Sequence, residues 1–218
     1  MKYFSDIQDN VVKDDNVATV TSKSTTISES QCPKRISSAM QVGELLFLFH
    51  GDKVWKVKGG QVENGPIDID EIFPEAGAVN VSVSVGNLTF IIHNRTIYGY
   101  NYFAAIDTFR IANGWPKVLH DHVLFSPKAV FPLSNGSVVL TSNEAFVTYD
   151  LVSNRPISIG DLNRFFPNLP EDLNSGILTQ PDSDDILRFF TTDQVVDYNS
   201  RIHQTISSQP LAVFVACQ

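Results

Sequence analysis

Charged side chains are scarce in this 218-residue chain, and acids outnumber bases among them. Asp, Glu, Lys and Arg together make up 18% of the residues, below the ~25% that soluble domains usually carry. The formal net charge is -8, and no basic run is longer than Lys34-Arg35. Because binding to nucleic-acid phosphates or to an anionic bilayer requires a basic face, the composition argues against both as partners.

Long apolar segments are missing too. The longest strongly apolar run covers residues 45–49, far short of the ~20 residues that a bilayer-spanning helix requires. Met1 is followed by Asp6 and Asp9 and not by the apolar core of a signal peptide. The sequence therefore predicts no membrane span and displays no signal peptide.

Motifs that carry catalysis are absent as well. There is no His-Glu-x-x-His zinc motif, no Gly-x-Ser-x-Gly elbow and no Gly-rich phosphate loop. His120-Asp121-His122 is the tightest histidine cluster, and it is either a metal-ligand pair or a solvated surface helix. On a helix, residues two apart point ~200° away from each other, which favours the second interpretation. The segment 182–185 lacks the Gly and distal Glu of a calcium loop, so we interpret it as a charged hairpin turn. The sequence predicts no enzyme.

Only two cysteines are present, Cys32 and Cys217. Taken alone, the pair fits either one structural disulfide that brackets a domain or two unrelated buried thiols. Four Asn-x-Ser/Thr tripeptides are candidates for N-glycosylation, at Asn80, Asn87, Asn94 and Asn135. This number favours an extracellular location, where a disulfide also persists.

Residues 1–31 differ from the rest of the chain. They contain a Thr/Ser-rich tract at residues 19–30 and few large apolar side chains. Such a segment buries too little surface to offset its ordering entropy. We predict a disordered Ser/Thr-rich tail or hinge at 1–31 and a folded domain at 32–218.

What the chain has in abundance is strand-forming sequence, including 15 Phe. Apolar runs followed by a short turn and an alternating segment predict four hairpins, at 45–57, 88–100, 138–149 and 186–198. Their turn residues, Asp52, Asn94, Asn143 and Asp193, lie 42, 49 and 50 residues apart. A period of about 40–50 residues is typical of β-propellers. We expect Leu46, Phe47, Phe90, Leu140 and Phe189 on inner strands, and Trp55, Ile97, Phe146 and Val196 at equivalent places between the repeats.

Each of the first three repeats continues with a proline-framed segment. Prolines near the start and just past the end of residues 68–72, 117–124 and 161–165 predict a short helix in each.

These features together resemble a known family. Residues 43–49 and 52–57, with the Gly-x-Pro, short-helix and Phe-Pro elements, look like the first blade of a hemopexin-like domain, as found at the C-terminus of matrix metalloproteinases. The resemblance implies an all-β, four-bladed propeller with a short helix at the end of each blade and blades at about 32–75, 76–126, 127–170 and 171–217. It also implies a disulfide between Cys32 and Cys217 that joins the first blade to the last.

The resemblance also implies acidic residues at the mouth of a central channel, near a calcium ion. At the corresponding positions this chain has Ser37, Asn80, Lys128 and Asn174. These residues leave a calcium ion only backbone carbonyls and neutral groups, so we predict weak or absent calcium dependence.

The function that the resemblance implies is non-catalytic binding of extracellular proteins, namely matrix components, protease inhibitors or protease substrates. One alternative is that the chain is the C-terminal fragment of a secreted zinc endopeptidase. A further alternative is a carrier of a small ligand in the channel or of haem, although haem binding in the family resembles work shared by two such domains.

Overall fold

The computed structural model describes residues 32–216, and these residues form an all-β structure with three one-turn helices. The predicted tail at 1–31 and Cys217 lie outside the described residues. The strands form three hydrogen-bonded sheets, none of which closes on itself.

The first sheet has four antiparallel strands in sequence order. They are β1 (Ser38–Val42), β2 (Leu45–His50), β3 (Lys53–Lys58) and β4 (Gln61–Asp68), followed by helix α1 (Ile69–Ile72). The second sheet contains β5 (Val81–Val85), β6 (Leu88–His93), β7 (Thr96–Phe103) and β8 (Thr108–Ile111), and the short β9 (Lys117–Val118) also pairs with β7.

The third sheet has eight strands but consists of two antiparallel groups. One group is β10 (Ala129–Pro132), β11 (Val138–Thr141), β12 (Ala145–Asp150) and β13 (Arg155–Asp161), followed by α2 (Leu162–Phe165). The other is β14 (Ser175–Gln180), β15 (Ser183–Phe190), β16 (Gln194–Asn199) and β17 (Gln204–Pro210), followed by α3 (Leu211–Phe214). A single parallel pairing, Val130 with Ser175, joins β10 to β14. The chain therefore contains four sequential strand groups.

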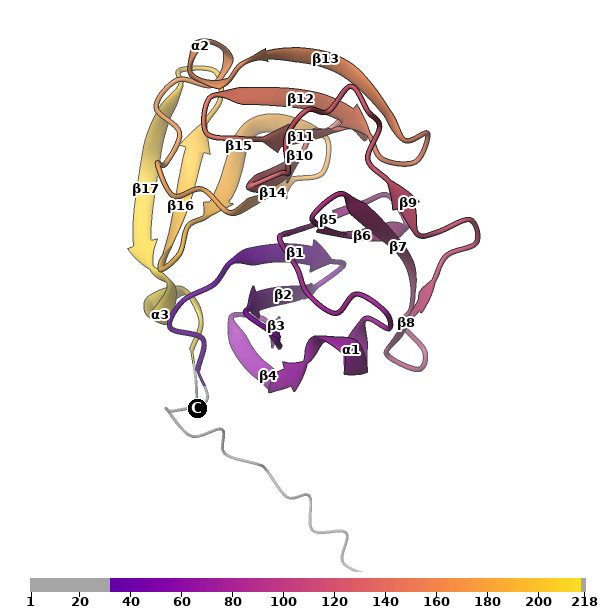
Figure 1. The fold of residues 1–218 in the computed structure, drawn as a ribbon. Coiled ribbons are helices and arrows are strands. Elements are labelled where there is room, and N and C mark those ends of the chain that lie inside the picture. Colours follow the sequence, from indigo (N-terminus) through magenta and orange to yellow (C-terminus); the bar gives the residue numbers. More distant parts are fainter. Residues whose placement is uncertain (1–31, 217–218) are drawn as a thin grey trace, which may run out of the picture.

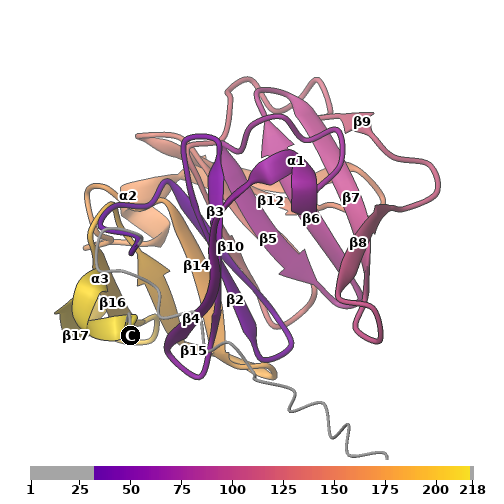
Figure 2. The same ribbon diagram turned by 90° about the horizontal axis from the view of Figure 1, so that it is seen from below.

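The four groups stand around one axis, with the first strand of each group innermost (Figure 1). Strands β5, β10 and β14 run beside one another near this axis in the view from below (Figure 2). The Oγ atoms of Ser38 and Ser82 lie 2.8 Å apart, and the backbone N–H of Ala39 donates to Ser175 Oγ at 2.7 Å. These bonds tie β1 to both β5 and β14.

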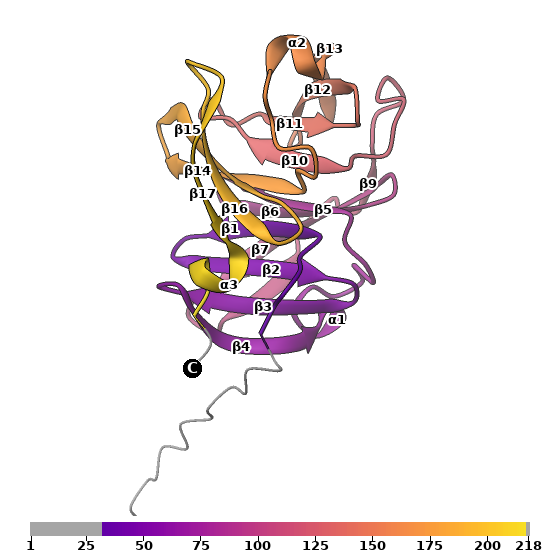
Figure 3. The same cartoon turned by 90° about the vertical axis from the view of Figure 1, so that its left-hand side faces the viewer.

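The last described residue returns to the first sheet. Ala216 donates its backbone N–H to the carbonyl of Gly60 at 2.7 Å and accepts from the N–H of Val62 at 3.2 Å. Helix α3 accordingly lies beside the first strand group (Figure 3). At the other end of the domain, Ile36 donates to the carbonyl of Thr192 in the fourth group at 2.8 Å. Hydrogen bonds near both ends of the described residues thus connect the first and fourth groups.

All four predicted hairpins are confirmed, as β2–β3, β6–β7, β11–β12 and β15–β16. Strand β2 is apolar at consecutive positions because both of its faces are covered. Leu46 and Leu48 pack with residues of the fourth group, whereas Phe47 and Phe49 pack toward the second. Each of the four apolar clusters likewise joins two neighbouring groups.

The five residues expected on inner strands lie on the second strand of each group, next to the innermost strand, and all five are buried. The expected equivalence of Trp55, Ile97, Phe146 and Val196 is wrong in part. Trp55 and Val196 are each the third residue of their strand after the hairpin turn, and they face the preceding group. Ile97 and Phe146 are each the second residue of their strand after the turn, and they face the following group. A shift of one residue turns a strand side chain to the opposite face. All four side chains are nevertheless buried between groups.

Two of the three predicted helices are confirmed, as α1 and α2, and the helix expected at 117–124 is wrong. Residues 117–118 pair with β7 instead, and the segment after them wraps around the guanidinium group of Arg95. That group donates to the carbonyls of Leu119, His120 and Val123 at 3.2, 3.2 and 2.6 Å. These bonds use carbonyl oxygens that a helix would have paired within itself.

Candidate functional site

The four positions predicted at a channel mouth do lie together. Ser37, Asn80, Lys128 and Asn174 each precede the innermost strand of one group, and all four line one cavity of about 770 Å³. We call it the strand-start pocket. In each case the backbone N–H donates to the second strand of the same group, with acceptors Phe49, Ile92, Thr141 and Phe190 at 2.7 to 3.0 Å. This shared bond makes the four positions structurally equivalent.

The four mouth positions offer no carboxylate to a calcium ion, although Glu171 and Asp172 also line the pocket. Asn80 accepts from the backbone of Asn94 at 2.6 Å, and Asn174 donates to the carbonyl of Ile36 at 3.0 Å. The ammonium of Lys128 donates to Asn143 Oδ1 at 2.7 Å and adds a positive charge. No group of three or more His, Cys, Asp or Glu within residues 32–216 is arranged to hold a metal.

The axis is closed just beyond this pocket. Ser38, Ser82, Val130 and Ser175 follow within two residues of the four mouth positions, and all four are fully buried. The Ser82 N–H and hydroxyl both bond the Ser38 hydroxyl, so the polar groups at the closure are satisfied. The two ends of the axis are therefore separate sites.

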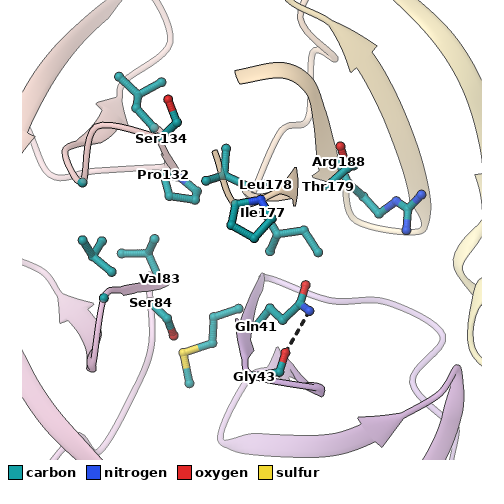
Figure 4. A pocket seen from close by; sticks show the side chains of 17 residues that line it. Gln41, Gly43, Val83, Ser84, Pro132, Ser134, Ile177, Leu178, Thr179 and Arg188 are labelled. Carbon is teal, nitrogen blue, oxygen red and sulfur yellow. Dashed lines mark hydrogen bonds between the residues drawn. The ribbon is translucent and has the colours of Figure 1, made fainter. Parts of the chain in front are cut away.

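A second cavity, of about 690 Å³, opens at the opposite end of the axis, where the inner strands turn back in hairpins (Figure 4). We call it the hairpin-end pocket. Its apolar lining comes from all four groups: Met40, Val83, Val85, Pro132, Leu133, Ile177, Leu178 and Pro181. A cavity of this size and composition lies within the range of ligand-binding pockets, roughly 300–1,000 Å³.

Turn geometry keeps the hairpin-end pocket open. Gly43, Gly86 and Gly136 line it at positive φ angles of 59°, 59° and 83°, a conformation that glycine adopts without a steric penalty. A Cβ added at any of the three would meet no atom within 4 Å. The sequence reasoning missed this pocket, and the glycine after each of the first two inner strands was the signal that pointed to it.

The one basic side chain of this lining, Arg188, is already paired. Its Nε and Nη2 donate to the two carboxylate oxygens of Asp197 at 2.7 and 3.0 Å, and its guanidinium lies 5.3 Å from the centre of the Phe214 ring. The Arg188 guanidinium holds the pKa of Asp197 below its ordinary value. The two side chains therefore form a bidentate, charge-assisted pair, and the charge of Arg188 is balanced within the protein.

Neither of the other two charged motifs forms a metal site. The rings of His120 and His122 lie 4.7 Å apart, and the His122 N–H donates to His120 Nδ1 at 3.2 Å. The expectation that these rings point apart is wrong because it assumed a helix. The segment 182–185 forms the β14–β15 hairpin as expected, with Asp184 accepting from Ser134 and Asp185 pairing with Arg201.

The glycosylation candidates fall into two spatial pairs. Asn80 lines the strand-start pocket and bonds Asn94, whereas Asn87 and Asn135 stand in hairpins that line the hairpin-end pocket. All four are exposed. No cysteine among the described residues is free, and since Cys217 lies outside them the pairing with Cys32 stays a prediction.

No family model matches the sequence. The chain is 24% identical over 153 residues to Matrix metalloproteinase-C of Caenorhabditis elegans, a match that takes in 68% of this chain and 26% of that protein. The chain thus spans about a quarter of the length of this curated relative.

Several solved structures share the fold. CP4 from cow pea, described as a hemopexin fold protein, matches with a TM-score of 0.67 at 13% identity, over 84% of this chain and 96% of CP4. The seed albumin LS24 from Lathyrus sativus gives 0.68 at 15% identity, over 84% and 96%. A lectin with two metal binding sites from Cicer arietinum gives 0.65 at 17% identity, over 82% and 94%.

The relative and the structures agree with the resemblance seen in the sequence. Residues 32–216 form a hemopexin-like domain. Among these residues no helix has the length and apolar character needed to cross a bilayer.

Proposed function

We propose that this hemopexin-like domain is a non-catalytic module that binds other extracellular proteins. The observation that carries the proposal is the hairpin-end pocket, an open cavity of about 690 Å³ lined by all four strand groups. Eight of its lining side chains are apolar, and its one basic side chain is paired within the protein. Such a pocket offers a partner protein the apolar contact that forms the core of protein–protein interfaces.

We propose further that the four strand groups are the blades of a four-bladed propeller, at about 32–75, 76–126, 127–170 and 171–217. The equivalent bonds of Ser37, Asn80, Lys128 and Asn174 support this division. A Cys32–Cys217 disulfide would join the first and last blades, which hydrogen bonds from Ala216 already connect.

The partner class follows from the family resemblance and the charge. Matrix proteins, protease inhibitors and protease substrates are the proposed partners, and secretion is part of the same proposal. The net charge of -8 favours a partner with a basic patch, which would speed association and make it sensitive to salt.

One observation favours a second candidate. The similarity to Matrix metalloproteinase-C takes in only 26% of that protein, as expected if this chain corresponds to one part of a larger secreted zinc endopeptidase. In that case the domain would supply recognition and the proteolytic activity would lie in the remainder.

The test is a pull-down from extracellular matrix or conditioned medium at low and high salt, beside a peptidase assay on the purified chain. We expect specific partners that are partly released by salt, and no peptide cleavage. Chelator-sensitive proteolysis by the purified chain, or capture of no protein at either salt concentration, would overturn the proposal.

A further inference from the structure

The hairpin-end pocket combines an apolar lining with an acidic rim. Three acids adjoin its lining residues: Glu44 follows Gly43, Asp182 follows Pro181, and Asp184 bonds Ser134. Glu44 reaches one lysine, Lys58, at 3.9 Å. Three acids beside the lining thus stand against two basic groups, Lys58 and the lining residue Arg188, and each of these two is paired with an acid.

The polar side chains of the pocket lining already hydrogen-bond within the protein. Gln41 donates to the carbonyl of Gly43 at 2.9 Å, Thr179 donates to the carbonyl of Ile186 at 2.7 Å, and Ser134 donates to Asp184 at 3.0 Å. Figure 4 shows Pro132, Ile177 and Leu178 near the centre of the pocket, with Arg188 beyond them at one side. A ligand in the centre would therefore meet apolar side chains and polar side chains that are already paired, and this favours apolar groups.

The opposite end of the axis has a different character. The strand-start pocket has the Lys128 ammonium and the amides of Asn80 and Asn174 at its mouth, and Glu171 and Asp172 also line it. The buried layer at Ser38 and Ser82 separates it from the hairpin-end pocket. The lining of the strand-start pocket thus carries charges of both signs, whereas the single charged side chain in the lining of the hairpin-end pocket, Arg188, is paired with Asp197.

We infer that the hairpin-end pocket binds a polypeptide segment of a partner protein that presents apolar side chains flanked by Lys or Arg. Apolar side chains enter the cavity, and the basic residues beside them meet Glu44, Asp182 and Asp184 at the rim. This inference rests on the proposed protein-binding function and names the segment that its pocket recognises. A polypeptide suits the site because it carries both kinds of side chain close together on one chain.

The experiment uses the full chain and fluorescent synthetic peptides of equal length in three compositions: apolar with basic flanks, apolar with acidic flanks, and polar with basic flanks. Binding is measured by fluorescence anisotropy at two salt concentrations. We expect measurable binding of the first peptide only, weakened at high salt because exposed ion pairs are screened.

Two variants with matched controls locate the binding. Gln41 is exposed on β1 and lines the pocket, so Gln41→Trp should occlude it and weaken binding roughly ten-fold, whereas Gln209→Trp on the exposed outer strand β17 should have no effect. Asp182→Lys at the rim should weaken binding roughly two- to five-fold, whereas Asp121→Lys, in the segment before Lys128, should have no effect. Circular dichroism checks that each variant is folded.

Several outcomes would overturn the inference. They are equal binding of all three peptides, binding of none, or binding that Gln41→Trp leaves unchanged. A small uncharged apolar dye that binds as tightly as the first peptide would assign the pocket to small ligands, and a dimer abolished by Gln41→Trp would assign it to a second copy of the chain. If the wild-type chain still captures partners in the pull-down while these peptides fail, the protein-binding function stands and only the assignment to this pocket falls.

Discussion

The hydroxyl group of Tyr198 donates a 2.7 Å hydrogen bond to the carbonyl oxygen of Pro167, across the boundary between the third and fourth strand groups. Tyr100 makes the corresponding bond to Pro74 at 2.8 Å. Tyr149 lies midway between them in sequence, 49 residues from each, and there the hydroxyl accepts from the His120 N–H at 3.0 Å. Burial raises the pKa of Tyr198, so its hydroxyl remains a donor at neutral pH.

Replacing Tyr198 by Phe leaves the rest of the ring in place and removes this bond together with the 3.2 Å hydrogen bond between the same hydroxyl and His203 Nδ1. We expect Tyr198→Phe to lower the free energy of unfolding by about 1 kcal/mol, measured by urea denaturation. Tyr98→Phe is the matched control, since no hydrogen bond of the Tyr98 hydroxyl is seen within residues 32–216. Equal losses in the two variants would show that the bond between groups contributes nothing.

Trp55 is only 8% exposed, between the first and fourth groups. We expect Trp55→Ala to lower the free energy of unfolding by about 3–5 kcal/mol, because it leaves a large cavity in a packed interior. Denaturant titration measures the change. A loss below about 1 kcal/mol would mean that the boundary between these groups is not held by this packing.

The Cys32–Cys217 disulfide is predicted to hold the first and last groups together. A bond that closes so long a loop stabilises by roughly 5 kcal/mol in the chain-entropy model, so Cys32→Ser should lower the melting temperature markedly. Peptide mapping under non-reducing conditions checks the pairing directly. Recovery of both cysteine peptides as free thiols would disprove it.

Calcium removal should leave the domain unchanged. Ligand charge largely sets affinity for this ion, and the mouth positions offer neutral groups and the Lys128 ammonium. We expect the same melting temperature with calcium and with a chelator. A decrease of more than a few degrees on chelation would show that backbone carbonyls suffice to hold the ion.

The Arg188–Asp197 pair predicts a loss of stability in acid. Hydrogen bonding to Arg188 lowers the pKa of Asp197 in the folded state, whereas the unfolded chain titrates near ~3.9. The pair's stabilisation is therefore present above the unfolded pKa and is lost as the pH falls through the lowered folded pKa. Stability curves from pH 6 downward should fall less steeply in Asp197→Asn than in the wild type, and parallel curves would contradict the assignment.

Much of the strand pattern was accessible from sequence because it depends on local order. The run at residues 45–49 predicted β2, and the recurring turns at Asp52, Asn94, Asn143 and Asp193 predicted four hairpins that the structure confirms. The register was less accessible. Where both faces of a sheet are covered, successive residues along a strand are all apolar, so the sequence does not show which of them faces which neighbouring group. For this reason Ile97 and Phe146 were grouped with Trp55 and Val196, although the two pairs face opposite neighbouring groups.

The mouth positions were also found from sequence, because each stands immediately before an inner strand whose start the repeat marks. The helix expected at 117–124 was not found, since its carbonyls bond Arg95, more than twenty residues earlier in the chain. No local signal distinguishes a carbonyl that pairs within a helix from one that pairs with a distant guanidinium group.

By itself, the sequence determined the strands, their turns, the repeat and the acidic charge, since each follows from the order of neighbouring residues. Only the tertiary structure decided where the axis is closed and where it is open. The buried hydroxyls of Ser38 and Ser82 meet there from strands 44 residues apart, and the hairpin-end pocket combines residues of all four groups. Such a site exists only once the groups pack around the axis, because no single group can bury both of its apolar faces alone.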